Sequence, residues 1–206
     1  MTARQPRQLL RRDERRAQIL RAAAVAFSES GFAATSVEDV AKQAGITKLI
    51  VYRHFESKAE LYRAILDEVA RRLSEEFLEL VAEDSTVGSG TSGVLSLLNV
   101  ARELPDGFRL LFLHAAREPE FAGFASEFRE LQTHVAAGVL EPVIADATIR
   151  AWGTRQLVDS LVTSVLNWLD TGDPARDHLF VDMTTSAVRS SVISWANVAD
   201  HALRPL

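Results

Sequence analysis

Apolar residues recur every three to four positions along most of the chain, which is the spacing of one face of an α-helix. This period predicts helices at about residues 12–30, 36–44, 48–54, 57–83, 94–103, 106–117, 119–140, 154–169 and 175–203. Gly31 should end the first helix, Pro119 should lie in the first turn of the seventh, and Pro142 should end or kink that helix near Leu140. Alternating strand patterns are almost absent. The predicted fold is all-α, with about nine helices.

Two of the short helices are joined by a tight turn that contains one glycine. The apolar face of the first consists of Val37, Val40, Ala41 and Ala44. Thr35 or Ser36 can cap its N-terminus, and Gly45 can end it because glycine adopts the left-handed conformation without a Cβ penalty. Thr47 is placed to cap the second helix. Two helices joined by a tight glycine-containing turn are typical of a helix-turn-helix, whose second helix enters the DNA major groove.

Residues 36–61, SVEDVAKQAGITKLIVYRHFESKAEL, resemble the DNA-binding signature of the TetR family of bacterial transcription regulators. The matching residues are Ser36, Val37, Val40, Ala41, Ala44, Gly45, Ile46, Lys48, Val51, Tyr52, His54, Phe55 and Lys58. The resemblance implies that Tyr52 and His54 contact phosphate and base, and that Lys58 binds phosphate. Leu49 departs from the small residue or proline usual in the family. Beyond the first quarter to third of the chain, the resemblance implies architecture but no particular ligand.

Five further residues of this segment are candidate DNA contacts. Lys48 begins the second helix and can donate to a guanine edge or a phosphate. Arg53 can bind guanine, and Leu49 can contact a thymine methyl group. Ser36 and Thr47 can offer hydroxyl and backbone N–H groups to phosphate. For each exposed residue the alternative is an ordinary solvated helix face. Val51 and Phe55, by contrast, are expected to face the core.

Charge is divided unevenly along the chain. Residues 1–60 carry 11 Lys and Arg against 7 Asp and Glu, a net charge of +4, whereas residues 61–206 carry 12 against 21, a net charge of −9. A basic N-terminal part favours docking on DNA phosphates, although uneven surface charge is also common. The arginine-rich residues 1–10 could contact DNA or be an unstructured terminus. We expect a DNA-binding domain over residues 1–56 and a ligand-binding and dimerisation domain over residues 57–206.

Enzyme chemistry finds no support in the sequence. The chain lacks cysteine, the G-x-S-x-G and H-E-x-x-H motifs and a glycine-rich phosphate loop. The five histidines are His54, His114, His134, His178 and His201, and none share a helix face at metal-ligand spacing. We therefore expect neither a metal nor a cofactor. The absence of cysteine, of a signal peptide and of a transmembrane run predicts a cytoplasmic location.

The C-terminal helices are where the resemblance implies a small-molecule pocket. The candidate ligand-binding residues are Phe77, Phe108, Phe112, His114, Phe128, His134, Asn167 and Trp168. Aromatic walls with a few polar groups are typical of ligand sites, but the same pattern also describes a plain core.

The last two helices carry two adjoining apolar faces each, which favours pairing with a second copy into a four-helix bundle. Charges at Val165 and Val192 are then expected to give a monomer. We expect a homodimeric repressor that leaves a palindromic operator when a small apolar or amphipathic ligand binds. The alternatives are an activator or a DNA-binding protein of the same fold without a ligand.

Overall fold

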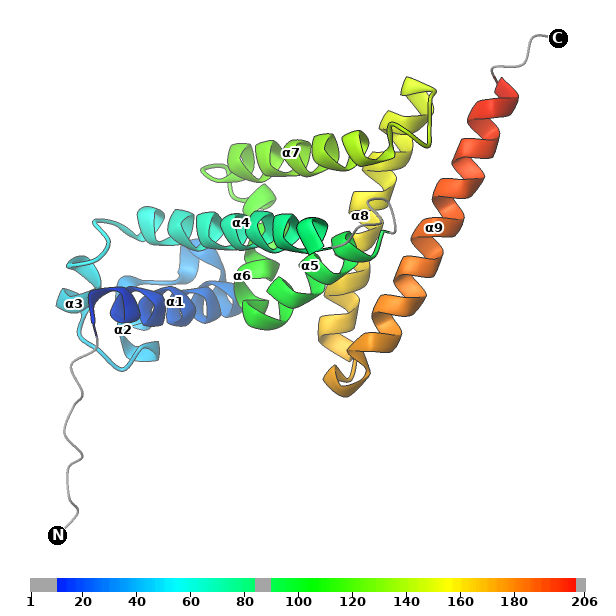
Figure 1. Cartoon of the computed structure of the whole chain (residues 1–206). Coiled ribbons are helices and arrows are strands. Elements are labelled where there is room, and N and C mark those ends of the chain that lie inside the picture. Colours follow the sequence, from blue (N-terminus) through cyan, green and yellow to red (C-terminus); the bar gives the residue numbers. More distant parts are fainter. Residues whose placement is uncertain (1–10, 84–89, 203–206) are drawn as a thin grey trace. The chain divides into compact units, whose positions relative to one another are not determined.

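The chain forms two compact units, residues 1–67 and residues 68–206, called unit 1 and unit 2 below. The computed structural model describes residues 11–83 and 90–202, and the side chains of residues 11–79 and 90–200 (Figure 1). All regular structure in these residues is helical, with nine α-helices, which confirms the predicted fold. The division between the units lies inside α4 (Lys58–Glu83), whereas the sequence placed a domain boundary before this helix. The difference arises because the first turns of α4 are buried in the core of unit 1.

Unit 1 contains α1 (Arg12–Ala34), α2 (Val37–Gln43), α3 (Lys48–Tyr52) and the start of α4. Its largest buried side chains are Ile19, Phe27, Val40, Val51, Phe55, Leu61, Tyr62, Ile65 and Leu66. The rings of Phe27 and Tyr62 meet edge to face, with centroids 5.1 Å apart. Burying each such side chain contributes about 1.5–3 kcal/mol, so this core holds the two short helices in a fixed orientation.

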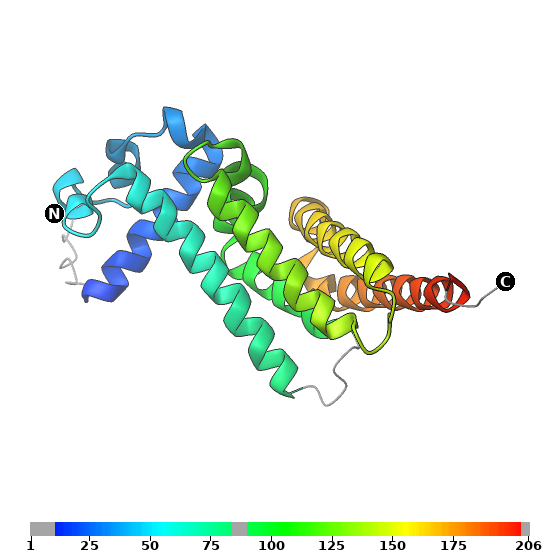
Figure 2. The same cartoon turned by 90° about the horizontal axis from the view of Figure 1, so that it is seen from above.

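Unit 2 consists mainly of α5 (Thr91–Glu103), α7 (Ala122–Leu140), α8 (Ala147–Thr171) and α9 (Asp177–Ala202). α8 packs against α5, α7 and α9, and α9 also contacts α5 (Figure 2). α7 ends two residues before Pro142, as predicted. None of the helices in the part of the chain that the structure describes is long and apolar enough to cross a membrane.

Both final helices differ from their predicted limits. α8 begins seven residues earlier than expected, because the side chain of Asp146 caps it by accepting the backbone N–H of Ile149 at 2.8 Å. α9 follows a 3₁₀ turn, Pro174–Arg176. Val165 is fully buried within the protomer. The expectation that a charge at Val165 gives a folded monomer is therefore wrong, because that charge would disrupt the core of unit 2 itself.

The segment between α5 and α7 is not the single α-helix that its apolar pattern predicts. It consists of α6 (Pro105–Arg109), a π-helical turn (Leu110–His114) and a 3₁₀ turn (Ala115–Arg117). The expected place of Pro119 in the first turn of α7 is also wrong. The carbonyl of Glu118 accepts the N–H groups of Phe121 and Ala122, both at 2.9 Å, so Pro119 lies in a turn before the helix.

Candidate nucleic-acid interface and ligand cavity

The turn between α2 and α3 is held by backbone hydrogen bonds and by one side chain. Gly45 has φ +64°, the left-handed conformation that the sequence predicts at this position. The N–H of Ile46 donates to the carbonyl of Ala41 at 2.9 Å. The side-chain amide of Gln18, on α1, donates to the carbonyl of Ala44 at 2.9 Å. The turn is therefore tied both to α2 and to α1, and the angle between the two short helices is fixed.

α3 presents one face outward. Val51 is buried, whereas Leu49 is 63% exposed and Tyr52 44% exposed, and Lys48 and Arg53 are also exposed. In a helix-turn-helix, the outward face of the second helix is the one that enters the major groove.

Ser36 and Thr47 flank the two helices but differ in their contacts. The hydroxyl of Ser36 donates to the carboxylate of Asp39 at 2.6 Å and accepts the N–H of Asp39 at 3.2 Å, completing a capping box. Thr47 occupies the N-cap position of α3 without a capping bond from its side chain. Thr47 therefore offers a freer hydroxyl to a phosphate than Ser36 does.

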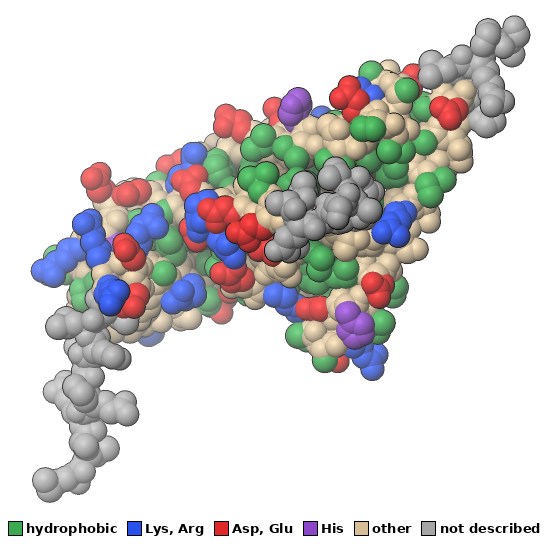
Figure 3. Space-filling model, viewed as in Figure 1, with side chains coloured by type: hydrophobic (Ala, Val, Ile, Leu, Met, Phe, Trp, Pro, Cys, Tyr) green, Lys and Arg blue, Asp and Glu red, His purple; other side chains and the backbone are tan. Residues whose placement is uncertain are grey.

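His54 is half-buried at the end of α3. Burial lowers its pKa first, and the nearby guanidinium groups of Arg12, Arg15 and Arg16 lower it further. The lowered pKa favours the neutral imidazole at physiological pH in the DNA-free protein. The arginines belong to the start of α1 and place positive charge beside α3; Lys and Arg side chains gather over this end of unit 1 in Figure 3.

Lys58 lies in a more structural position than its predicted role suggests. Its ammonium donates to the carbonyls of Phe32 and Thr35 at 2.8 and 3.0 Å, and lies 4.4 Å from the centroid of the Phe32 ring. These carbonyls belong to the end of α1, where backbone acceptors lack helical partners. In this structure Lys58 holds α1 against the start of α4.

Unit 2 contains a cavity of about 670 Å³. Its apolar lining includes Leu73, Phe77, Leu97, Phe112, Val139, Leu161, Val162, Val188 and Val192. The charged lining residues are Arg129, Asp159 and Arg189, and the first two approach to 3.5 Å. A cavity of this size is typical of sites that enclose a drug-sized apolar ligand.

Phe77 and Phe112 are the two predicted ligand-binding residues that line this cavity. Phe108 lies behind Phe112, fully buried, with ring centroids 4.6 Å apart, and Phe128 also contacts the ring of Phe112. The indole N–H of Trp168 instead donates to Asp177 at 2.6 Å.

His114, His134 and Asn167 also lie outside the cavity lining. His134 and Asn167 are exposed, and His114 is half-buried on the π-helical turn. The sequence missed the aliphatic lining, because the helical period marks apolar faces without distinguishing a filled core from a cavity. One available signal was the run of small residues on α5, where Gly93 and Ser96 line the cavity.

The segment that forms unit 1 matches a known family model. Residues 19–65 match the model of bacterial regulatory proteins of the tetR family. Residues 19–65 are a DNA-binding domain of the tetR family. The relatives that this chain resembles include HTH-type transcription regulators and a nucleoid occlusion factor.

The similarity extends beyond unit 1. The chain is 28% identical to the HTH-type transcriptional activator FasR of Mycolicibacterium smegmatis over 171 residues, which cover 80% of this chain and 77% of FasR. The crystal structure of a TetR-like regulator from Rhodococcus sp. RHA1 superposes with a TM-score of 0.74 at 21% identity, covering 93% of this chain and 99% of that chain. The structure of AibR in complex with isovaleryl coenzyme A and operator DNA gives a TM-score of 0.65 at 18% identity, covering 84% and 97%. At such identities the two structures show a shared fold.

Proposed function

We propose that this protein represses transcription from a palindromic operator and leaves the DNA when a small apolar or amphipathic molecule fills the cavity of unit 2. The cavity carries this proposal: about 670 Å³ with a largely aliphatic lining, in a chain whose unit 1 is a helix-turn-helix. AibR, of the same fold, was solved with both isovaleryl coenzyme A and operator DNA, which supports the binding of a small molecule as well as DNA by this fold.

α4 is the element through which the ligand would act. It supplies Leu73 and Phe77 to the cavity, and its earlier residues Leu61 and Ile65 to the core of unit 1. A ligand that favours a different position of α4 would change the separation of the two recognition helices in a dimer. To move the population from 1:99 to 99:1, the ligand must bind the DNA-incompetent state about 10⁴-fold more tightly than the competent one.

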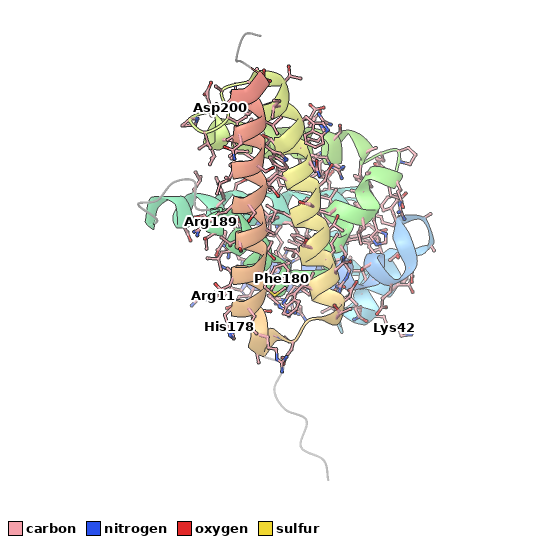
Figure 4. The ribbon with its side chains drawn as sticks, turned by 90° about the vertical axis from the view of Figure 1, so that its right-hand side faces the viewer. Arg11, Lys42, His178, Phe180, Arg189 and Asp200 are labelled. Carbon is pink, nitrogen blue, oxygen red and sulfur yellow. The ribbon has the colours of Figure 1, made fainter. Side chains whose placement is uncertain are left out.

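The proposed dimer uses α8 and α9, which lie side by side on one face of unit 2 (Figure 4). α9 exposes large apolar side chains that the protomer does not cover: Leu179, Met183, Ile193 and Val198 are 46%, 74%, 60% and 56% exposed. Apolar residues repeated along one helix support an interface between two copies.

A cavity-filling variant tests the ligand proposal. Val162→Trp should fill the cavity from α8, leaving DNA affinity intact while abolishing the response to ligand. Isovaleryl coenzyme A and longer-chain acyl-coenzyme A compounds serve as first probes, with DNA binding followed by fluorescence anisotropy on fragments selected from genomic DNA. If none of the probes, nor the apolar dye 1-anilinonaphthalene-8-sulfonate, binds the wild-type cavity, the ligand proposal fails.

Activation is the second candidate, because the relative FasR is a transcriptional activator. Transcription in vitro from a template carrying the selected operator separates the two modes. Repression predicts fewer transcripts on adding the protein, and activation predicts more.

A further inference from the structure

An ion pair joins the two helices of the helix-turn-helix on its outer surface. The ammonium of Lys48, at the start of α3, donates to the carboxylate of Glu38, in the first turn of α2. The two side chains are 45% and 59% exposed. The ammonium also lies 5.6 Å from the centroid of the Tyr52 ring. Lys48 is thus oriented by two neighbours.

Fold stability does not account for this pair. Exposed ion pairs contribute only about 0–1 kcal/mol. The neighbouring Asp39 already completes the capping box of α2, so Glu38 is not needed as a cap. The hydrogen bond between the two side chains lowers the pKa of Glu38 and raises the pKa of Lys48. Both groups therefore stay charged near neutral pH.

The pair is poorly suited to binding phosphate. A lysine that is already neutralised gains little from a phosphate, and the carboxylate beside it repels one. A base pair is a better match. The major-groove edge of G·C offers two adjacent acceptors, guanine N7 and O6, followed by a donor, the cytosine N4 amine. The Lys48–Glu38 pair offers a donor and an acceptor side by side.

An A·T pair also offers an acceptor beside a donor, adenine N7 and the N6 amine. Only guanine, however, offers the ammonium two adjacent acceptors, and the cytosine amine is the usual partner of a carboxylate. We propose that Lys48 and Glu38 together bind one G·C base pair in each half-site, with Lys48 on guanine and Glu38 on cytosine. Glu38 is then a specificity-determining residue that also weakens sequence-independent binding. This inference rests on the proposed docking of α3 in the major groove.

Selection from a randomised duplex library tests the inference with the full-length protein. Wild type should select a fixed G·C pair at one symmetric position. Glu38→Gln should lose that preference by about tenfold while keeping the others, because the glutamine amide can donate as well as accept and so no longer selects the cytosine amine. On a scrambled duplex, Glu38→Gln should bind more tightly, and the plot of log affinity against log salt should steepen by about one, since Lys48 becomes free to pair with a phosphate.

Two further variants separate charge from position. Glu38→Asp keeps the charge on a shorter side chain, so it should lose the G·C preference without the steeper salt dependence. Glu29→Gln removes the same charge from an exposed position on α1 and should keep the base preference.

An unchanged selection profile for Glu38→Gln, or equal weakening at every position, overturns the inference and leaves the DNA-binding proposal intact. If wild type selects no sequence at all, both fail.

Discussion

At the scale of single residues, Lys58 and Tyr52 should separate folding from DNA binding. Lys58→Ala removes the donor from the carbonyls of Phe32 and Thr35 and should lower the free energy of unfolding by about 1–3 kcal/mol. Tyr52 is 44% exposed, so Tyr52→Ala should leave stability within about 0.5 kcal/mol and weaken DNA binding.

Urea unfolding followed by circular dichroism measures the first effect, and anisotropy at fixed salt measures the second. Equal stability of Lys58→Ala and wild type would mean that its bonds to α1 contribute nothing to folding. Unchanged DNA affinity of Tyr52→Ala would remove Tyr52 from the interface.

Gly45 gives a second test at this scale. Its φ of +64° is disfavoured for residues with a Cβ, yet no atom beyond the adjacent residues of the chain lies within 4 Å of where that Cβ would be. Any loss on substitution therefore reports backbone strain and not collision. Gly45→Ala should cost about 1–2 kcal/mol, Gly45→Val more, and Gly45→Asn much less. A thermal unfolding series in which Asn is no better than Val would contradict this reading of the turn.

At the scale of elements, Asp177 joins three helices of unit 2. Its carboxylate accepts from the guanidinium of Arg102, on α5, at 2.7 and 3.0 Å, and from the indole of Trp168, on α8. Asp177→Asn should cost about 1–3 kcal/mol because a partly buried guanidinium loses its charged partner. Trp168→Phe removes the indole N–H and keeps the ion pair, so Trp168→Phe with Asp177→Asn forms a double-mutant cycle that isolates the indole hydrogen bond.

The same carboxylate predicts a pH dependence. Arg102 first, and then Trp168, lower the pKa of Asp177 below its ordinary value. The folded chain then binds fewer protons than the unfolded chain, so this contribution is complete above the ordinary carboxyl pKa and is lost as the pH falls through the lowered one. In unfolding curves measured from pH 7 to pH 3, Asp177→Asn should lose less stability than wild type. A parallel loss would exclude this role.

At the scale of the whole molecule, the proposed dimer predicts that a charge on α9 separates the protomers. Met183 is 74% exposed, so Met183→Glu should leave the protomer folded and give a monomer in sedimentation equilibrium at micromolar concentration. Its operator affinity should fall because a monomer contacts one half-site. Leu131→Glu, on the exposed face of α7, is the matched control and should stay dimeric. A dimeric Met183→Glu would move the interface elsewhere.

The all-α fold, the helix-turn-helix and the left-handed conformation of Gly45 could all be predicted from the sequence. These follow from local rules, since helical period, capping residues and glycine act within a few positions of the chain. The sequence pattern placed the limits of α8 wrongly, although aspartate, as at Asp146, is a common N-cap residue. The outward face of α3, with Leu49 and Tyr52 exposed and Val51 buried, also agrees with the sequence pattern.

The contacts of individual side chains could be seen only in the folded chain. Lys58 lies against the end of α1, and Glu38 meets Lys48 across ten residues of sequence. Val165 is sealed in the protomer, and the cavity is lined mainly by aliphatic residues, with Phe77 and Phe112 among them. An apolar helical face has the same sequence pattern whether it packs in a core, lines a cavity or contacts a second copy. The choice depends on packing between helices distant in sequence, which no local pattern contains.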